Sequence, residues 1–386
     1  MTKKKALITA SVASMIDLFN MDNIHILQEL GYEVHVASNF EFGSITSQER
    51  VDTFRSELVA DGISVFHVPI PRSIGAVKNI FVSYRQMKQL IEKEEYHIVH
   101  TQSPIGGVVA RLAARKAGKK GTKVIYTAHG FHFFNGAPKR NWLLFYPIEK
   151  WLSRYTDVLI TINKEDYERA KTFHAQKVCY VPGIGVDVDR FQRPIRNREE
   201  LRSEFGFTEE DFVLLSVGQL SERKNQATVI RAMEKISDKN VKYLIVGLGE
   251  MEENDRKLVK KLGLVGKVVF AGYRSDVAEL LQMSDGFIFP SQQEGLPVSL
   301  MEAMAAGVPV IASRIRGNTD LINDTIDGML IETMDVDGYV KAMQKIKADK
   351  TLQQQFAISA LKKVQEFSIE CVHEKMKDIY WNIGKL

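Results

Sequence analysis

The sequence is poor in the features that mark secreted, metal-binding and membrane-spanning proteins. Its only cysteines are Cys179 and Cys371, and neither belongs to a CxxC pair or to another metal-ligand spacing. A scaffold held together by disulfides is therefore excluded, and the composition suits a reducing cytoplasm. No apolar run approaches the roughly 20 residues that a helix needs to span a bilayer.

The N-terminal segment MTKKKALITASVASMI has the basic start, the apolar run and the small residues of a signal peptide. Thr9, Ser11 and Ser14 interrupt the apolar run, so we interpret it as the first buried strand. We therefore expect a cytoplasmic protein, either free or bound peripherally to the inner face of the cell membrane.

Two nucleotide-related signatures are also missing. No GxGxxG motif follows the first strand, so the sequence lacks the main signature of an NAD-dependent oxidoreductase. We find no RNA- or DNA-binding motif either. These absences disfavour a dehydrogenase and a nucleic-acid-binding protein.

The net charge of +4 is unevenly distributed along the chain. Residues 1–185 contain 24 Lys and Arg against 17 Asp and Glu, a charge of +7, and the remainder contains 28 against 31, a charge of −3. A basic N-terminal half favours an anionic partner, such as a membrane surface or a diphosphate-linked acceptor.

The fold class follows from the order of the apolar segments. With 386 residues, 45% hydrophobic and 26% charged, the chain is long enough for two globular domains. Short apolar segments alternate with helical ones, which predicts parallel, doubly wound α/β sheets. The predicted strands are 5–10, 32–37, 63–68, 97–101, 123–127 and 158–162, then 212–217, 242–246, 268–271, 286–289, 308–312 and an edge strand at 328–331. We expect a loop at 11–14 and a helix at 17–30.

The most informative stretch is SDGFIFPSQQEGLPVSLMEAMAAGVPVIAS, residues 284–313. It predicts a strand, a polar loop and a helix at 298–306, with Pro297 in the first turn and a cap at Gly307. Open α/β sheets bind ligands beyond the carboxyl ends of their strands. Glu294 in this loop and Glu302 in the helix could accept paired hydrogen bonds from a sugar diol, and the amides at the helix start could bind an anion.

This stretch resembles the E-x7-E signature of the retaining glycosyltransferases of the glycogen-synthase-like family four, and the resemblance extends over nearly the whole chain. It implies the GT-B fold, in which two Rossmann-like domains face a cleft. It also implies that Glu294 lies by the donor sugar and that Glu302 binds the nucleotide ribose. The implied donor-binding segment between them is Gly295, Leu296, Pro297, Val298 and Ser299.

Arg223 and Lys224 follow the strand predicted at 212–217. A guanidinium and an ammonium there could clamp a diphosphate, although an Arg-Lys pair alone is more often solvated. The resemblance implies that they stabilise the leaving nucleotide diphosphate, which can replace a divalent metal. We therefore expect no metal and no cofactor, with the nucleotide-diphosphate sugar as co-substrate.

Four further residues complete the expected donor site. Gly218 and Gly247 follow strands and allow the backbone to approach a ligand closely, although a tight turn explains Gly247 equally well. The resemblance implies that the turn at Tyr273 and Arg274 holds the nucleobase.

His129 ends the predicted strand in YTAHGFHFF, residues 126–134. From the residues alone it is either a packed core histidine or a site residue. The resemblance implies that it touches the donor sugar near the reaction centre. His132 has the same chemistry, and neither histidine has a carboxylate at a useful metal-ligand spacing. Many members of the family carry a glycine pair in the first loop, where this sequence has Ala13 and Ser14.

Residues 139–155, KRNWLLFYPIEKWLSRY, mix aromatic, aliphatic and basic side chains. They predict either an interfacial segment that meets lipid phosphates or a helix packed on the sheet, and both interpretations stay open. Pro147 should bend or start a helix there. The interfacial residues would be Trp142, Leu143, Phe145, Tyr146 and Trp151 with Lys139, Arg140, Lys150 and Arg154.

The segment VPGIGVDVDRF, residues 181–191, suits a domain boundary and resembles the family's linker motif. We expect an N-terminal acceptor-binding domain at 1–185, completed by a C-terminal helix at 368–386, and a nucleotide-sugar-binding domain at 186–367. The last helix carries one apolar stripe, which consists of Val372, Met376, Ile379, Tyr380 and Ile383.

The resemblance implies a retaining, metal-independent glycosyltransferase. Its expected activity moves a hexosyl or N-acetylhexosaminyl group from a UDP-sugar to a lipid-linked glycan in the synthesis of a capsule or exopolysaccharide. Two alternatives stay open. One is an isomerase similar to UDP-N-acetylglucosamine 2-epimerase, and the other is a non-catalytic subunit of a glycosylation complex.

Overall fold

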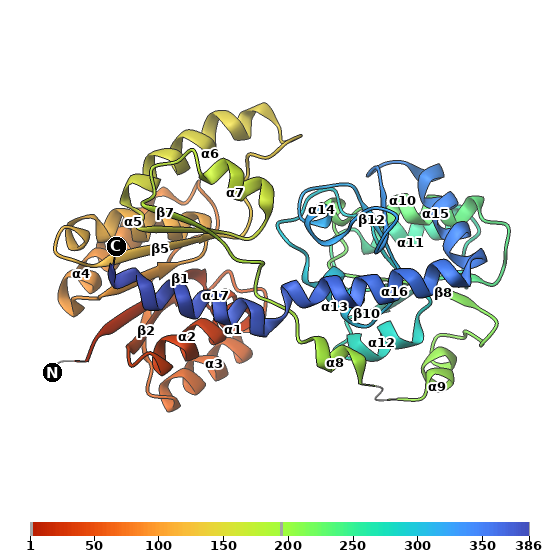
Figure 1. Cartoon of the computed structure of the whole chain (residues 1–386), viewed down its shortest axis with the longest axis horizontal. Coiled ribbons are helices and arrows are strands. Elements are labelled where there is room, and N and C mark those ends of the chain that lie inside the picture. The colour runs from red at the N-terminus through yellow and green to blue at the C-terminus, as the bar shows by residue number, and fades with distance from the viewer. Residues whose placement is uncertain (1–2, 194–195, 386) are drawn as a thin grey trace. The chain divides into compact units, whose positions relative to one another are not determined.

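The computed structural model describes residues 3–193 and 196–385. The chain divides into two compact units, Met1–Ile184 with Val372–Leu386 and Gly185–Cys371. Each unit contains one parallel sheet covered by helices, as the sequence predicted for a doubly wound α/β protein (Figure 1). The C-terminal helix therefore belongs to the same unit as the N-terminal strands.

The N-terminal unit contains a seven-stranded sheet of order β3-β2-β1-β4-β5-β6-β7. Every neighbouring pair is parallel. The order reverses between β1 and β4, which is where doubly wound sheets place their ligands. The strands are β1 (Lys5–Val12), β2 (Glu33–Asn39), β3 (Ser64–His67), β4 (Ile98–Thr101), β5 (Lys123–Ala128), β6 (Val158–Thr161) and β7 (Lys177–Tyr180).

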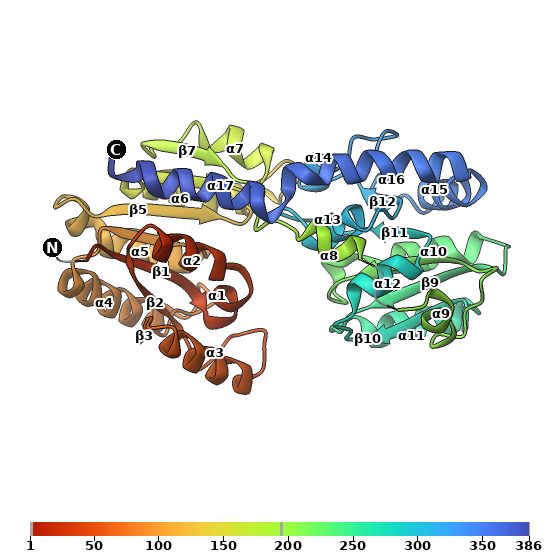
Figure 2. The same cartoon turned by 60° about the horizontal axis from the view of Figure 1, so that its bottom comes forward.

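Helices cover both faces of this sheet (Figure 2). Alternate residues of β1 separate the two cores: Ile8 packs in one cluster and Leu7 in the other, as the period of two in a strand requires. One face packs against α1 (Ala13–Phe19), α2 (Met21–Glu29), α3 (Gln48–Ala60) and α17 (Ile369–Asn382). The other packs against α4 (Val77–Glu94), α5 (Pro104–Gly118), α6 (Lys139–Leu152) and α7 (Lys164–Ala170).

The C-terminal unit repeats the same topology with six parallel strands in the order β10-β9-β8-β11-β12-β13. Its strands are β8 (Phe212–Val217), β9 (Val241–Val246), β10 (Val268–Gly272), β11 (Gly286–Phe289), β12 (Val310–Ser313) and β13 (Met329–Ile331). The predicted edge position of the last strand is confirmed. The helices are α8 (Val188–Gln192), α9 (Arg198–Ser203), α10 (Gln226–Lys235), α11 (Glu252–Lys261), α12 (Val277–Met283), α13 (Val298–Ala305), α14 (Asn318–Leu321), α15 (Val336–Ala348) and α16 (Lys350–Val364).

The start of the chain differs from the prediction. The expected loop at 11–14 is absent, because β1 continues to Val12 and α1 begins at Ala13. The expected helix at 17–30 is two helices that meet at Asn20, whose buried side chain donates to the carbonyl of Met15. An asparagine that bonds nearby backbone competes with helix continuation, so the break has a local cause.

The C-terminal helix α17 is held on the N-terminal sheet by its apolar stripe and by one buried polar contact. All five predicted stripe residues are buried in the core that contains Ile8 and Ile160. The Tyr380 hydroxyl lies 2.7 Å from Nδ1 of His100 on β4, whose Nε2 lies 2.8 Å from the Thr127 hydroxyl. His100 is fully buried, and both of its ring nitrogens therefore have partners.

We expect the Tyr380→Phe substitution to lower the free energy of unfolding by about 1–3 kcal/mol, because it leaves a buried nitrogen of His100 without a partner. Urea unfolding measures the change. The matched control is Trp381→Phe, one residue along α17, where the side chain is 67% exposed and the change should stay within about 0.5 kcal/mol. Equal effects in the two variants would contradict a structural role for this contact.

The same histidine makes stability depend on pH. Burial lowers the pKa of His100 to about 3, whereas a histidine in an unfolded chain titrates near 6.5. As the pH falls from 7, the unfolded chain binds this proton before the folded chain does, so the free energy of unfolding decreases. His100→Gln should flatten this decrease between pH 6.5 and 4 in urea titrations. A variant with the wild-type slope would contradict the assignment.

Candidate active site

The C-terminal sheet brings the predicted donor-site residues to its switch point. The order of the sheet reverses between β8 and β11. Arg223 and Lys224 lie in a single 3₁₀ turn, Glu222–Lys224, in the segment after β8, and Glu294 lies in the loop after β11. Two loops at the carboxyl ends of adjacent parallel strands meet at one edge, so residues about 70 positions apart in the sequence lie together.

The Glu294 carboxylate is the centre of this cluster. Its Oε1 accepts a hydrogen bond from Arg223 Nη1 at 2.7 Å, pairs with Lys224 Nζ at 2.8 Å, and accepts from the Ser291 hydroxyl at 2.6 Å. The sequence analysis assigned the carboxylate to the sugar and the two cations to the diphosphate. The structure brings all three together, with the carboxylate as the counterion of both cations.

Lys224 is the more enclosed of the two cations in the cluster. Its side chain is only 13% exposed, and its ammonium lies 4.5 Å from the centre of the Phe289 ring. Burial lowers the pKa of Lys224, while the neighbouring Glu294 opposes that decrease. The charge of Lys224 therefore depends on a nearby anion, which is the property expected of a group that binds a phosphate.

Three residues that the sequence analysis missed position the cluster. Asn225 has a left-handed backbone (φ 58°), and its side-chain amide donates to the carbonyls of Pro290 (3.1 Å) and Thr333 (2.9 Å). Ser291 donates to Glu294, and Arg316 Nε donates to the Glu294 carbonyl at 3.2 Å. The one signal in the sequence for Asn225 is its residue type, because asparagine tolerates this conformation better than most residues.

Glu302 lies apart from this cluster on α13. Its side chain is partly buried, and burial raises the pKa of Glu302 while the charge of Arg190 on α8 opposes the increase. The predicted helix is confirmed, but Pro297 is its N-cap (φ −80°, ψ 121°) and does not lie in the first turn. The helix is followed by Gly307 with a φ of 68°, as a left-handed C-terminal cap requires.

The loop between Glu294 and Glu302 packs closely against the backbone at Gly317. Gly295, Val298 and Ser299 are partly buried, and Leu296 and Pro297 are buried. The first amides of α13 have no partner within the helix, so this loop retains donors. Gly317, which has a φ of 84°, approaches it so closely that an added Cβ would lie 2.5 Å from the carbonyl oxygen of Gly295.

The two expected glycines of the donor site touch each other. A Cβ on Gly247 would lie 1.9 Å from the carbonyl oxygen of Gly218, so the turns after β8 and β9 pack backbone against backbone. A Cβ on Gly218 would lie 3.4 Å from Cε of Lys224. Glycine at position 247 is therefore required for the packing of the site, whatever ligand the site binds.

Tyr273 and Arg274 follow β10 at the edge of the sheet. Tyr273 is 76% exposed. Arg274 Nε donates to Asp276 at 2.7 Å, and its Nη2 pairs with Asp276 and with Glu204. These hydrogen bonds raise the pKa of Arg274. The guanidinium is thus held in place by carboxylates, and its role toward a nucleobase stays a prediction.

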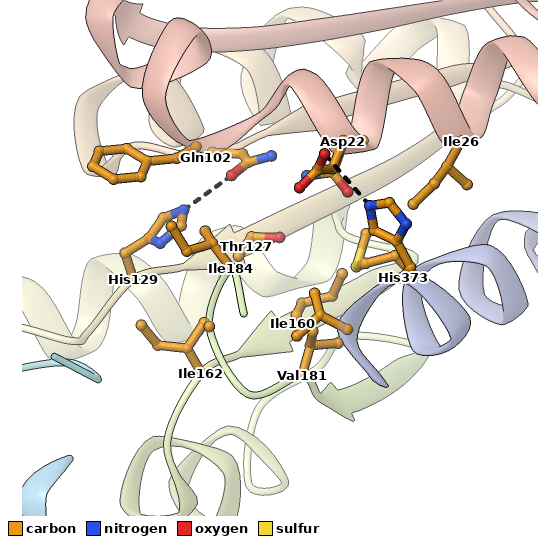
Figure 3. Close-up of a pocket in the computed structure, with 15 residues that line it drawn as sticks. Asp22, Ile26, Gln102, Thr127, His129, Ile160, Ile162, Val181, Ile184 and His373 are labelled. Carbon is orange, nitrogen blue, oxygen red and sulfur yellow. Dashed lines mark hydrogen bonds and ion pairs between the residues drawn. The ribbon is translucent and has the colours of Figure 1, made fainter. Parts of the chain in front are cut away.

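In the N-terminal unit, His129 follows β5 and meets a residue from the switch point. Its Nε2 lies 2.9 Å from Oε1 of Gln102, which follows β4 (Figure 3). Gln102 also donates to Asn20. Burial lowers the pKa of His129 to about 4, so the imidazole is neutral at pH 7. Gln102 had no signal in the sequence beyond its place after a strand.

His129 lines two cavities of the N-terminal unit. The smaller, about 30 Å³, has room for one or two waters and also contains the Asp22–His373 ion pair (3.5 Å) between α2 and α17 (Figure 3). The larger, about 340 Å³, is mostly apolar. His132 lines the larger cavity as well, with its ring 4.7 Å from that of Phe145.

The segment 139–155 forms helix α6 and a short 3₁₀ turn, Ser153–Tyr155. Pro147 lies inside α6 and does not start it. Trp142, Phe145 and Tyr146 pack against the core that contains Phe131 and Phe133, so for these three residues the structure agrees with the interpretation of a helix packed on the sheet. The apolar residues that α6 exposes are Leu143, Leu144, Ile148 and Trp151.

Across residues 3–193 and 196–385, no group of three or more His, Cys, Asp or Glu side chains could hold a metal ion. Within the same residues, every helix is too short or too polar to cross a bilayer.

Comparisons with known proteins agree on one family. The family model of glycosyl transferases group 1 matches residues 197–363, and that of glycosyltransferase family 4 matches residues 23–190. A putative glycosyltransferase of Bacillus subtilis, EpsD, is 40% identical over 383 residues, which cover 98% of this chain and 96% of EpsD.

A second relative is the UDP-Gal:alpha-D-GlcNAc-diphosphoundecaprenol alpha-1,3-galactosyltransferase of Escherichia coli. It is 32% identical over 336 residues, which cover 84% of this chain and 85% of the relative. Among solved structures, Anabaena Alr3699/HepE in complex with UDP and glucose superposes with a TM-score of 0.77 at 18% identity, covering 99% of this chain and all of that one. At that identity the likeness shows the fold alone.

We expect Gly317→Ala to displace the loop that carries Glu294 and to lower the free energy of unfolding by more than about 1 kcal/mol, because the new Cβ meets a backbone oxygen at a positive φ. Gly263→Ala is the control, since Gly263 also has a positive φ (68°) but nothing lies within 4 Å of its added Cβ. Urea unfolding compares the two variants. An effect at Gly317 no larger than at Gly263 would show that the close approach does not matter.

Proposed function

Because the chain belongs to the family 4 glycosyltransferases, we propose that it transfers a hexosyl or N-acetylhexosaminyl group from a nucleotide-diphosphate sugar to a lipid-linked glycan. The observation that carries this proposal is the cluster of Arg223, Lys224 and Glu294 at the switch point of the C-terminal sheet. A UDP-sugar is the proposed donor, because the name of the Escherichia coli relative specifies UDP-Gal.

The two cations stabilise the leaving group. When the donor binds, its diphosphate replaces Glu294 as the counterion of Arg223 and Lys224. The guanidinium can fork two phosphate oxygens, and the ammonium acts as a point charge. Because these charges lie where negative charge develops as the glycosidic bond breaks, they lower the barrier more than they strengthen ground-state binding. No divalent metal is needed for this step.

Glu294 then becomes free to accept hydrogen bonds from hydroxyls of the donor sugar. Glu302, partly buried on α13, binds the ribose diol, and the amides of residues 295–299 bind the phosphate or the sugar. The turn at Tyr273 and Arg274 holds the nucleobase. His129, neutral at pH 7, contacts the donor sugar as a hydrogen-bonding group and does not serve as an acid.

We propose that the reaction retains the anomeric configuration. The bond from the anomeric carbon to the diphosphate oxygen breaks, and the carbon gains oxocarbenium character. The acceptor hydroxyl attacks from the same face, and its proton passes to the departing phosphate oxygen. This route needs no covalent intermediate with a side chain. In this route the main catalytic contribution is stabilisation of the negative charge on the departing phosphate. Arg223 and Lys224 supply that stabilisation.

The acceptor is a glycan on a lipid diphosphate, as the name of the Escherichia coli relative specifies for that enzyme. The basic N-terminal half of this chain suits such an anionic acceptor. We place the reaction in cell-surface polysaccharide synthesis, at the inner face of the membrane. The alternatives of an isomerase and of a non-catalytic subunit are less well supported. Relatives that match most of the chain are named as glycosyltransferases, and the charged cluster is intact.

The test is release of free nucleotide from a panel of UDP-sugars, each with and without undecaprenyl-diphosphate-linked N-acetylglucosamine. We expect release that requires the acceptor and that EDTA does not change. Arg223→Ala and Lys224→Ala should each lower turnover by about a hundredfold, as removal of other charge stabilisers does. Lys235→Ala is the control, because Lys235 forms an exposed ion pair on the same unit.

Two outcomes would contradict the proposal. Near-normal turnover in both cation variants would remove the assigned role of the cluster. Epimerised UDP-sugar in the absence of acceptor would favour the isomerase.

A further inference from the structure

The larger cavity beside His129 has the dimensions and lining of a site for a hydrocarbon chain. Its volume is about 340 Å³, within the usual range of ligand pockets. It lies within the N-terminal unit, between the start of α5, helix α6 and the segment after β5. Its apolar lining includes Ile74, Ile105, Val108, Phe133, Leu144 and Ile148.

The mouth of the cavity opens to solvent between α6 and the loop that precedes α4. Three residues that line it are also exposed: Ile74 by 58%, Leu144 by 46% and Ile148 by 39%. Apolar side chains that are both exposed and part of a concave lining mark a binding site more often than single exposed residues do. Two further exposed residues of α6, Leu143 and Trp151, do not line the cavity.

The opposite part of the lining is polar but internally paired. Glu149 accepts a hydrogen bond at 2.8 Å from Arg111, whose buried guanidinium lies 4.0 Å from the centre of the Tyr126 ring. His129 is bonded to Gln102. Because these groups already have partners, the cavity offers few polar atoms to a ligand and favours an apolar one with a single polar end.

We infer that this cavity binds the hydrocarbon chain of the acceptor at the end that carries the diphosphate. The inference rests on the proposed function, which supplies an acceptor with a polyprenyl chain. The polar end of the acceptor lies toward His129, where the proposed function places the donor sugar, and the chain leaves between Ile74 and Leu144. Taking each carbon to occupy about the volume of a water, ~30 Å³, the cavity of about 340 Å³ holds about eleven carbons, or two isoprene units.

The experiment compares acceptors with the same glycan diphosphate on chains of one, two and three isoprene units, in solution without vesicles. Each methylene removed from water can strengthen binding by up to about fourfold. We expect KM to fall at least tenfold from one unit to two and to change little with the third, because the cavity is then full. Equal KM values for all three acceptors in the wild-type enzyme would overturn the inference.

Matched variants of α6 locate the effect. Leu144→Trp and Ile148→Trp fill the cavity and should abolish the fall in KM that the second isoprene unit produces in the wild-type enzyme. Leu143→Trp is the control, because Leu143 is 80% exposed on the same helix and does not line the cavity. If Leu143→Trp had the same effect as the two fillers, the cavity would not be the site.

A binding measurement separates this inference from the proposed function. Geranyl diphosphate, which carries two isoprene units, is titrated calorimetrically into the protein without donor, with isopentenyl diphosphate as the short-chain comparison. Tighter binding of geranyl diphosphate that Ile148→Trp removes would support the cavity even if no transferase activity were found. Transfer without any chain-length preference would leave the function standing and reject the cavity. Binding that requires phospholipid vesicles, and that Leu143→Trp alters, would indicate a membrane surface instead.

Discussion

At the switch point of the C-terminal sheet, the Glu294 carboxylate pairs with both Arg223 and Lys224. The loops of this unit are arranged so that these three side chains meet. Without Glu294, Lys224 would be a buried ammonium beside an aromatic ring and a second cation, an arrangement whose desolvation favours loss of the proton. With Glu294, the Lys224 ammonium has a counterion in a region of low exposure. In the proposed function, this carboxylate is displaced when the diphosphate binds, which would couple diphosphate binding to the release of Glu294 for the sugar.

The backbone conformation around the cluster positions the charged groups of Arg223, Lys224 and Glu294. Asn225 tolerates a left-handed conformation so that the 3₁₀ turn carrying Arg223 and Lys224 can lead directly into α10. Gly247 and Gly317 have no Cβ, and this allows two pairs of turns to pack backbone against backbone. Substitution of either glycine displaces a loop without touching a charged group. The geometry of the site therefore depends on residues that carry no chemistry of their own.

The sequence predicted the parallel sheets well because these depend on local patterns. Apolar segments of four to six residues separated by helices specify strands, and the spacing of Glu294 and Glu302 places one in a loop and the other on a helix. The sequence could not predict contacts between residues that are far apart in the chain and meet only in the folded protein. Gln102 meets His129, and Tyr380 meets His100 across 280 residues. The break at Asn20 was missed because helical periodicity continues through it. The two interpretations of α6 stayed open because only packing shows which of its apolar residues face inward.

The two units share one topology but place different side chains at the switch point, charged in one unit and neutral in the other. At the switch point of the C-terminal sheet, the loops present formal charges that can bind and stabilise a diphosphate. At the corresponding edge of the N-terminal sheet, they present neutral groups, His129 and Gln102, next to a small cavity and a large, mostly apolar one. In the proposed function, the burial that lowers the pKa of His129 makes its imidazole a weak base toward the acceptor hydroxyl. Proton removal would then have to come from the donor's own phosphate, which is why the cations that control the charge of that phosphate carry so much of the proposed chemistry.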